Sequence, residues 1–266
     1  EKAKDSEFLD TLQDTIQPDL CITAAYGQYL PKRFLAAPTH GTVNIHPSLL
    51  PRWRGASPVQ RSLEAGDNPV GVTVLFTVSK MDAGPIIAQE EHKMEDDTQD
   101  AAALLPFLFD VGTQSLLQHL PRLLNGEITM DTATAQCDDD VVNADMISPK
   151  EAQLRPWEET ATQLNNRRRG FAMWPGVYVW LQIGDATPIK YKLIETSVLA
   201  GGVRDVTDVI VTQKSGLEMV CCDGSVLQIT RLQPATRKPM DAVSFLNGLQ
   251  GKTVRYVPEP DETGNV

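Results

Sequence analysis

The first half of the chain alternates short apolar runs with amphipathic segments. The apolar runs, each bounded by proline or glycine, predict strands at residues 20–25, 42–46, 70–76 and 86–90. Apolar positions at helical spacing predict helices at residues 6–16, 31–35 and 57–66. Strands that alternate with helices in this way indicate an α/β fold built on a mostly parallel sheet.

A longer helical segment follows at residues 98–124. Thr98 is placed to cap its first turn, and Gly126 is placed to end it. Pro106 and Pro121 fall inside the segment, so we expect one kinked helix or two shorter ones. Its leucine and phenylalanine positions are expected to pack in the core.

The second half of the chain shows another pattern. Residues 130–160 are polar and acidic, as in a linker, and short apolar runs between glycine-rich turns follow them. These runs predict a small closed β-barrel with a final helix at residues 240–249. The predicted strands are at residues 177–183, 190–198, 206–212, 217–222 and 226–232. The expected organisation is a first domain at 1–130, a linker at 131–160, a second domain at 161–258 and an acidic tail at 259–266.

Composition and charge argue against a membrane span, a metal site and disulfides, and they leave phosphate binding possible. The chain is 41% hydrophobic and 22% charged, which is ordinary for a globular protein, and no apolar run reaches the roughly 20 residues of a membrane span. The net charge is −11, but residues 1–145 carry 10 basic and 22 acidic side chains whereas residues 146–258 carry 14 and 10. The second half can therefore contact phosphates despite the acidic total. The four cysteines of the whole chain form no C-x-x-C pair, so we expect neither a metal site nor disulfides.

The most informative motif stands where the second predicted strand ends. Asn44 and His46 are two residues apart on that strand and so point to one face, and Pro47 ends the strand. An amide can hold a developing oxyanion and an imidazole can move a proton near neutral pH, so the pair suits acyl transfer. Asp82 lies in a turn after the strand at 70–76 and could bring a carboxylate to the same site. Each residue alone would more often be structural, so the interpretation depends on the joint pattern.

This joint pattern resembles the folate-dependent formyltransferases, in which Asn, His and Asp lie in an N-x-H-P-S-L-L-P segment and a later D-x-G segment. The two segments here are residues 44–51 and 82–84, and His46 and Asp82 are 36 residues apart, as in that family. The resemblance implies a doubly wound sheet, whose first strands are missing here, followed by an OB-like barrel. It covers the chain from about residue 8 to about residue 257.

The flanking residues resemble one branch of that family, the methionyl-tRNA formyltransferases. The segment R-W-R-G-A-S-P-V-Q-R at 52–61 carries this resemblance, together with segments at 148–152, 171–176 and 232–240. The resemblance implies that a formyl group passes from the co-substrate 10-formyltetrahydrofolate to the α-amine of methionine on initiator tRNA, for translation initiation. It implies that Asn44 binds the oxyanion, that His46 stabilises it and moves protons, and that Asp82 orients His46 or an ordered water. It also places Ser48, Leu49, Leu50 and Pro51 along the folate and Tyr26 and Gly27 at the border of its pocket, although both segments could be plain loops.

Basic residues in both halves are candidate contacts for tRNA. Arg52 and Arg54 flank Trp53, where a guanidinium could meet acceptor-stem phosphates or the terminal adenosine. A helix at 167–169 would turn at least one of three arginines to solvent, and Arg168 is the candidate there. A solvated basic surface would show the same pattern. The candidates on the predicted barrel are Lys190, Arg237 and Lys238.

Two other functions stay open at this point. One is another folate-dependent formyl transfer or hydrolysis that acts on a small amine or on water. The other is a non-catalytic derivative that binds tRNA or folate. The chain begins at Glu1 without the first strands and basic loop of the family, so we expect a fragment or a processed form with weakened activity. We expect a monomer, in the cytoplasm of a bacterium or in the mitochondrial or plastid matrix of a eukaryote.

Overall fold

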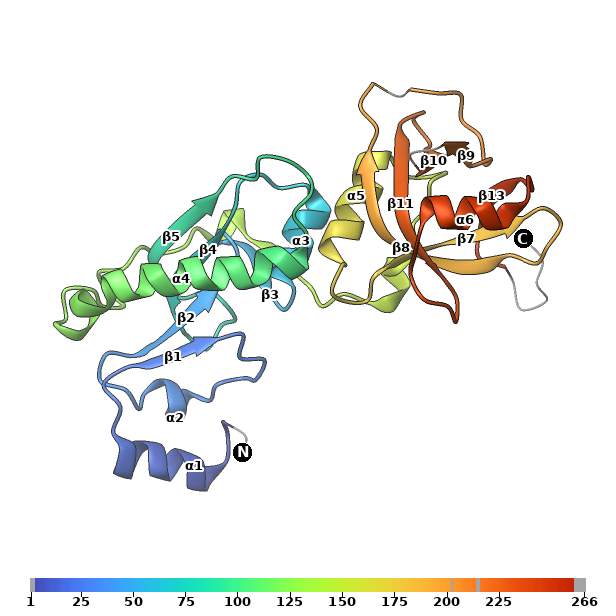
Figure 1. Ribbon diagram of the computed structural model, residues 1–266. Coiled ribbons are helices and arrows are strands. Elements are labelled where there is room, and N and C mark those ends of the chain that lie inside the picture. Colours follow the sequence, from blue (N-terminus) through green and yellow to red (C-terminus); the bar gives the residue numbers. More distant parts are fainter. Residues whose placement is uncertain (1–2, 202, 214–215, 261–266) are drawn as a thin grey trace. The chain divides into compact units, whose positions relative to one another are not determined.

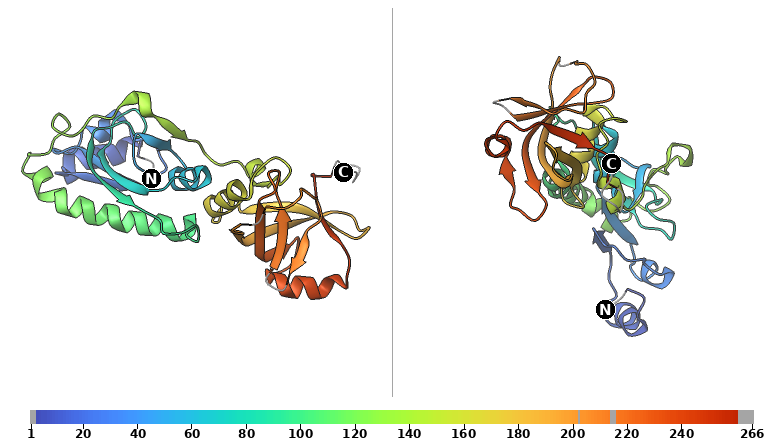
Figure 2. Two further views of the ribbon diagram at one scale, coloured as in Figure 1. Left: turned by 90° about the horizontal axis from the view of Figure 1, so that it is seen from above. Right: turned by 90° about the vertical axis from the view of Figure 1, so that its right-hand side faces the viewer.

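The computed structural model describes residues 3–201, 203–213 and 216–260, which form two compact units (Figures 1 and 2). Unit 1 takes in the described residues up to 62, with 67–95 and 103–146. Unit 2 takes in 63–66, 96–102 and the described residues from 147 onward. Most of the expected acidic tail, residues 261–266, lies outside the described residues.

Unit 1 is built on a four-stranded sheet in the order β1-β2-β4-β5. β1 and β2 pair in parallel, whereas β4 is antiparallel to both β2 and β5. The expectation of a mostly parallel sheet is therefore wrong for this chain. The connection from β2 to β4 leaves and re-enters the sheet at the same end of the strands instead of crossing its face, and His46 at the end of β2 lies opposite Thr73 in the middle of β4. The strands are β1 (Cys21–Ala24), β2 (Thr42–His46), β4 (Val70–Phe76) and β5 (Ile86–His92).

Helix α4 (Ala101–Leu124) runs along this sheet as one continuous helix, although it contains Pro106 and Pro121 (Figure 1). The helix and the sheet touch closely at Gly112, where an added Cβ would lie 2.5 Å from a side-chain carbon of Ile45. The absence of a side chain at Gly112 thus permits the packing. Thr98 does not cap the helix, because the side chain of Asp100 accepts the hydrogen bond from Ala102 N instead (3.0 Å).

Residues 131–146 form part of unit 1 rather than a free linker. Thr134 pairs with Ile86 at the start of β5, and β6 pairs in parallel with β3. The first contact attaches this segment to β5, and the second attaches it to the region just after β2, the strand that carries Asn44 and His46. The remaining elements up to residue 146 are α1 (Ser6–Asp10), the π-helix η1 (Thr11–Ile16), α2 (Lys32–Leu35), β3 (Arg52–Gly55), α3 (Pro58–Ala65), the 3-10 helix η2 (Asp138–Asp140) and β6 (Val142–Ala144).

Unit 2 holds a curled antiparallel sheet in the order β13-β7-β8-β11-β10-β9, with β12 beside β11. The segment before β9 reaches β13 at the other end of this order through an isolated bridge between Val209 and Arg255 and a hydrogen bond from Ile210 N to Val254 O (2.9 Å). The two ends of the sheet therefore meet at a bridge, not along a continuous ladder. The elements are the 3-10 helix η3 (Pro149–Ala152), α5 (Ala161–Gly170), β7 (Val177–Ile183), β8 (Ile189–Val198), β9 (Val211–Gln213), β10 (Gly216–Val220), β11 (Val226–Pro234), β12 (Met240–Asp241), α6 (Ala242–Leu249) and β13 (Val254–Val257).

A single apolar core fills unit 2. Inward-facing residues alternate along β7, where Val177, Val179 and Leu181 are buried, and α5 and α6 contribute Leu164 and Phe245. This alternation is the pattern expected of strands with one buried face. Within the described part of the chain, no helix has the length and apolar character needed to cross a bilayer.

Candidate functional site

The side chain of Asn44 is oriented by the neighbouring strand. Its Oδ1 accepts a hydrogen bond from Thr23 Oγ1 (2.9 Å), because the parallel register sets Thr23 opposite Asn44. Since the amide oxygen is engaged in this way, the Nδ2 donor points to the other side. The flanking Val43 and Ile45 are buried, so the strand backbone that carries Asn44 is held on both sides.

His46 is buried at the end of β2, with 5% of its side chain exposed. Its Nε2 lies 2.9 Å from the carbonyl oxygen of Trp53, and a carbonyl can only accept, so Nε2 carries a proton and donates it there. Nδ1 then faces Asp82 Oδ1 at 3.7 Å. The imidazole is thus fixed at one nitrogen and faces a carboxylate with the other.

Asp82 reaches this site from the turn between β4 and β5. Its backbone is left-handed, with φ of +48°, which few residues other than glycine adopt without strain. Its Oδ2 accepts a hydrogen bond from Gly55 N (3.0 Å). Its main-chain carbonyl and that of Gly84 both accept from Gln136 Nε2 (2.8 Å each). Asp82 therefore contacts two segments on the other side of β4 in the sequence, around residues 46 and 55.

Three polar side chains fix the backbone of the segment expected along the folate. Ser48 Oγ donates to Arg52 O (2.8 Å), one residue beyond the segment. Thr73 Oγ1 donates to Ser48 O (2.7 Å) and accepts from Leu50 N (3.1 Å), and Gln89 Nε2 donates to Leu50 O (2.8 Å). The four candidates in this segment therefore have a fixed backbone: Ser48 and Leu50 are buried, and Leu49 and Pro51 are half-buried.

Tyr26 and Gly27, the other folate candidates, are exposed just beyond the end of β1. Ala24 at the end of β1 pairs with Ile45 next to His46, so the two candidate segments leave the sheet at the same edge. The structure therefore brings the candidate catalytic residues of β2 and the folate candidates to one end of the parallel pair formed by β1 and β2.

The arginines that flank Trp53 already have protein partners. Arg52 Nε and Nη2 donate to the two carboxylate oxygens of Asp67 (2.8 and 2.9 Å), and its guanidinium lies over the ring of Trp53. Arg54 is turned inward, with 5% of its side chain exposed, and pairs with Asp138 at 2.9 Å. The pairing with Arg54 and Lys80 lowers the pKa of the Asp138 carboxyl.

Arg168 is also turned inward, with 8% of its side chain exposed. Its Nη1 lies 3.5 Å from Asp100, and its Nε donates to Thr196 Oγ1 at 3.4 Å. Burial lowers the pKa of this guanidinium, and the nearby carboxylate of Asp100 acts in the opposite direction. This placement supports a structural role for Arg168.

The other three tRNA candidates lie on neighbouring segments of unit 2. Lys190 Nζ lies 3.9 Å from the ring centre of Tyr178 and 5.4 Å from that of Trp180. Ala235 N donates to Lys190 O (3.0 Å), which attaches the turn that carries Arg237 and Lys238 beside this strand. Both of these basic residues are exposed.

Two functional residues were not predicted from the sequence. Thr23 orients Asn44, and Gln136 holds the Asp82 turn. Thr23 lies on a predicted strand at a position that could have been paired with Asn44 if the parallel register had been known. Gln136 lies in the segment assigned to a linker, and no local pattern distinguishes it from other polar residues there.

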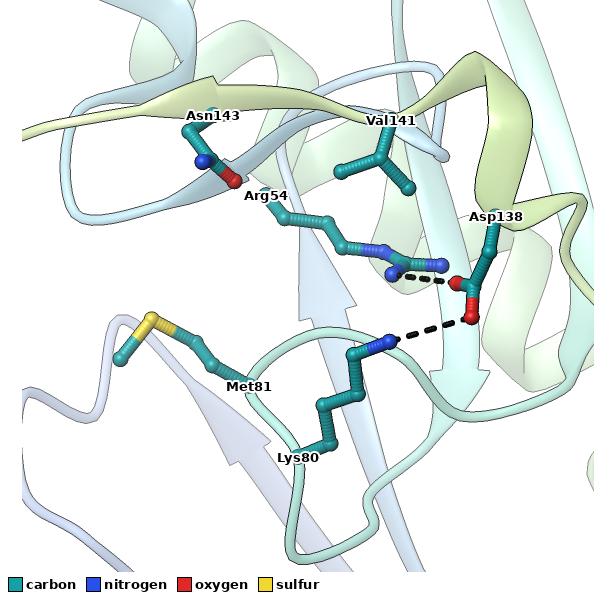
Figure 3. A pocket seen from close by; sticks show the side chains of 6 residues that line it. All are labelled: Arg54, Lys80, Met81, Asp138, Val141 and Asn143. Carbon is teal, nitrogen blue, oxygen red and sulfur yellow. Dashed lines mark hydrogen bonds and ion pairs between the residues drawn. The ribbon is translucent and has the colours of Figure 1, made fainter.

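A cavity of about 390 Å³ opens beside the Asp82 turn (Figure 3). Among the described residues, no group of three or more His, Cys, Asp or Glu side chains is arranged to hold a metal ion. The cavity is lined by Arg54, Lys80, Met81, Asp138, Val141 and Asn143.

Two family models match the chain. The model described as "Formyl transferase" matches residues 1–118, and the model described as "Formyl transferase, C-terminal domain" matches residues 146–250. The fold and the site thus define the class of the formyl transferases. Curated methionyl-tRNA formyltransferases are also similar. That of Enterococcus faecalis is 35% identical over 94% of this chain and 76% of its own length, and that of Halorhodospira halophila is 38% identical over 88% and 72%. The chain belongs to the methionyl-tRNA formyltransferase family.

Solved structures share the fold at lower identity. HypX from Aquifex aeolicus in complex with tetrahydrofolic acid has a TM-score of 0.65 and 15% identity, and the match covers 92% of this chain and 41% of HypX. The sugar 3N-formyltransferase WlaRD, crystallised with dTDP and 5-N-formyl-THF, has a TM-score of 0.58 and 16% identity, with 82% of this chain and 73% of WlaRD covered. These likenesses support the fold alone.

Proposed function

We propose that this chain transfers a formyl group from 10-formyltetrahydrofolate to the α-amine of methionine on initiator tRNA, for translation initiation. One observation carries the proposal. β2 carries Asn44 and His46 two residues apart, and the β4–β5 turn sets Asp82 Oδ1 3.7 Å from His46 Nδ1, in a chain 35% identical to a methionyl-tRNA formyltransferase.

The site residues have distinct tasks in this reaction. The amine attacks the formyl carbon, a new N–C bond forms, and negative charge develops on the formyl oxygen. Asn44 Nδ2 donates to that oxygen, since its Oδ1 is engaged by Thr23. The N10–C bond then breaks, and the proton lost by the amine passes to N10 through His46 or an ordered water. Asp82 holds the imidazole and stabilises positive charge on it while the proton moves.

We place the folate at the edge where β1 and β2 end. Ligands of α/β folds bind in the crevice beyond the carboxyl ends of neighbouring parallel strands, and the register of Ala24 with Ile45 sets two such ends side by side. Tyr26 and Gly27 follow one strand, and Ser48 to Pro51 follow the other. The exposed ring of Tyr26 and a backbone fixed by Thr73 suit a flat heterocycle.

We place tRNA contacts on the face of unit 2 that carries Lys190, Arg237 and Lys238. Positive charge on this face attracts phosphates, and the rings of Tyr178 and Trp180 beside Lys190 offer a stacking surface. Arg52 is a weaker candidate, because a tRNA phosphate would compete with Asp67 for its guanidinium. In this proposal the first domain carries the chemistry, the second binds tRNA, and the protein acts as a monomer in the compartment where its host initiates translation.

The proposal is tested by formyl transfer from labelled 10-formyltetrahydrofolate to methionylated initiator tRNA. The protein is expressed as the full polypeptide that its gene encodes, with the Enterococcus faecalis enzyme as a positive control. We expect transfer to the tRNA and none to glycinamide ribonucleotide, a small amine. Transfer to the small amine alone would overturn the proposed substrate, and binding of tRNA or folate without turnover would overturn the proposed activity.

The three site residues should each be needed for turnover. We expect Asn44→Ala, His46→Ala and Asp82→Ala to lower kcat by about 100- to 1000-fold, because each removes a preorganised polar group from the reacting centre. The control is His40→Ala, a histidine between α2 and β2. Turnover near that of the wild type in any of the three site variants would contradict the assignment of that residue.

A further inference from the structure

A chain of hydrogen bonds connects the Asp82 turn to buried Arg54 through Gln136. Gln136 Nε2 donates to the main-chain carbonyls of Asp82 and Gly84, at 2.8 Å each. Its Oε1 accepts from Arg54 Nε and Nη2, at 3.0 and 2.8 Å. One amide therefore makes four hydrogen bonds and joins the turn to strand β3.

The same guanidinium closes a ring of contacts back to the turn. Arg54 Nη1 pairs with Asp138 Oδ1 at 2.9 Å, and Lys80 Nζ pairs with Asp138 Oδ2 at 3.1 Å (Figure 3). Lys80 is two residues before Asp82. The outer half of this ring is solvent-exposed, with 66% of the Lys80 side chain accessible, and is worth little on its own. In the inner half, Arg54 is buried and Gln136 is half-buried.

The ring permits one orientation of the Gln136 amide. A flipped amide would direct its NH₂ group at the guanidinium, donor against donor, and its oxygen at two carbonyls, acceptor against acceptor. Arg54 therefore keeps both N–H bonds of Gln136 aimed at the turn. A backbone bridge between Thr134 and Ile86 places this glutamine beside the turn in the first place.

Asp82 needs such support more than an ordinary turn residue. Its φ of +48° is left-handed, which aspartate and asparagine adopt more readily than most residues but still at a cost, so the surroundings help to hold the conformation. Its carboxylate is anchored by Gly55 N at 3.0 Å and faces His46 at the longer distance of 3.7 Å. Gly55 directly follows Arg54, so Arg54 influences Asp82 both through Gln136 and through the position of this N–H group.

We infer that Gln136 and Arg54 are positioning residues for the Asp82 carboxylate. This inference rests on the proposed function. Gln136 acts through the backbone of Asp82 and Gly84 and does not touch the reacting atoms. Its loss lets the turn rotate and moves the carboxylate away from His46, and a displacement of about 1 Å at a reacting centre can cost about 100-fold in rate.

The test compares Gln136→Met with Gln136→Glu in the full enzyme. Gln136→Glu keeps the size of the side chain and an acceptor for Arg54 but replaces the donor with an acceptor that repels both carbonyls. We expect both variants to lower kcat about 10- to 100-fold with KM for either substrate changed less than threefold. If Gln136 served only to pair with Arg54, glutamate could replace it without loss of turnover. Wild-type kcat in Gln136→Glu would therefore overturn the inference. Lys80→Met, which cuts only the exposed half of the ring, is the matched control and should change kcat less than threefold.

A second measurement separates this inference from the proposed function. Asp82→Asn is combined with Gln136→Met, since asparagine tolerates the left-handed backbone. If Gln136 acts through Asp82, its substitution should cost less than twofold in kcat in the Asp82→Asn background. An undiminished cost there would overturn the positioning role while leaving the proposed activity intact. Full activity of Asp82→Asn alone would overturn the proposed role of Asp82 and this inference with it.

Discussion

At the scale of single residues, the site depends on which end of each side-chain amide faces the reacting centre. Asn44 can bind an oxyanion only through Nδ2, and Thr23 engages the opposite end of the amide at 2.9 Å. Thr23 Oγ1 also lies 3.2 Å from Val43 O, but a hydroxyl has one proton to donate, and we assign it to the shorter contact with Asn44 Oδ1. The orientation of the Asn44 amide is therefore set by a residue 21 positions earlier in the chain.

Replacement of this hydroxyl should lower turnover without loss of the fold. We expect Thr23→Val to reduce kcat roughly 3- to 10-fold, because Asn44 loses the partner of Oδ1 and its amide can rotate, at a cost near that of one hydrogen bond. The measurement is kcat at saturating folate and tRNA. Thr23→Ser keeps the hydroxyl and should retain activity. Equal activity of the valine and serine variants would show that Thr23 does not orient Asn44.

At the scale of elements, α5 shows why a run of charge does not define a surface. Three of the six buried residues of this helix have polar or charged side chains: Asn165, Arg168 and Arg169. These side chains find partners in the segment 96–102 and on β8: Asn165 Nδ2 donates to Asp97 (2.8 Å) and Arg169 Nε donates to Gln99 O (2.8 Å). Three consecutive arginines indicate a solvated helix face only when no acidic segment packs against them. The sequence pattern could not show that the acidic segment 96–102 packs against these arginines.

Arg168 should therefore matter for stability more than for tRNA binding. We expect Arg168→Met to lower the free energy of unfolding by about 2 to 3 kcal/mol, because loss of one partner from a largely buried ion pair is costly. Denaturation in urea, followed by fluorescence, measures this change. The affinity for tRNA, measured in parallel under native conditions, should stay within twofold. A large loss of affinity in a variant of normal stability would restore Arg168 as a tRNA contact.

The turn between β4 and β5 should likewise tolerate no side chain at Gly84. An added Cβ would lie 1.7 Å from Phe76 O, which is backbone and cannot yield cheaply. We expect Gly84→Ala to destabilise the protein by about 2 to 3 kcal/mol and to lower kcat as well, since the shifted turn carries Asp82. Gly248→Ala in α6 is the control, because nothing lies within 4 Å of the added atom and the backbone there is not left-handed. Equal thermal stability of the two variants would contradict the close packing at Gly84.

At the scale of the whole molecule, the division of charge matches the proposed division of tasks. The basic excess lies in residues 146–258, and Lys190, Arg237 and Lys238 place part of it on one face of unit 2. Much of the remaining basic charge near the site is already paired, as with Arg52 and Asp67. Net charge alone would have argued against a polyanionic partner, but binding follows the local surface.

Substitutions on this face should weaken binding in a salt-dependent way. We expect Lys190→Ala, Arg237→Ala and Lys238→Ala each to reduce tRNA affinity and to lower the slope of log affinity against log salt by about one unit or less, as loss of one phosphate contact does. kcat at saturating tRNA should not change. Arg122→Ala, which removes an exposed cation on α4, is the control. A reduced kcat with unaltered affinity would contradict the placement of the tRNA.

The sequence by itself determined most of the elements of this protein and supplied its candidate catalytic residues. Strands such as Val70–Phe76 and Val177–Ile183 follow from local apolar runs, and the N-x-H and D-x-G segments single out Asn44, His46 and Asp82 as candidates without any coordinates. Secondary structure and short motifs are local properties, so a local pattern suffices to predict them.

Only the tertiary structure decided the direction of β4, the single helix at Ala101–Leu124, the burial of Arg54 and Arg168 and the partnership of Gln136 with the Asp82 turn. Each of these depends on which distant segment packs against a residue. Strand direction depends on the path of a connection, and a charged side chain is buried only where an opposite charge lies close enough to pair with it. Such pairings join residues up to 84 positions apart, and no local pattern in the chain encodes them.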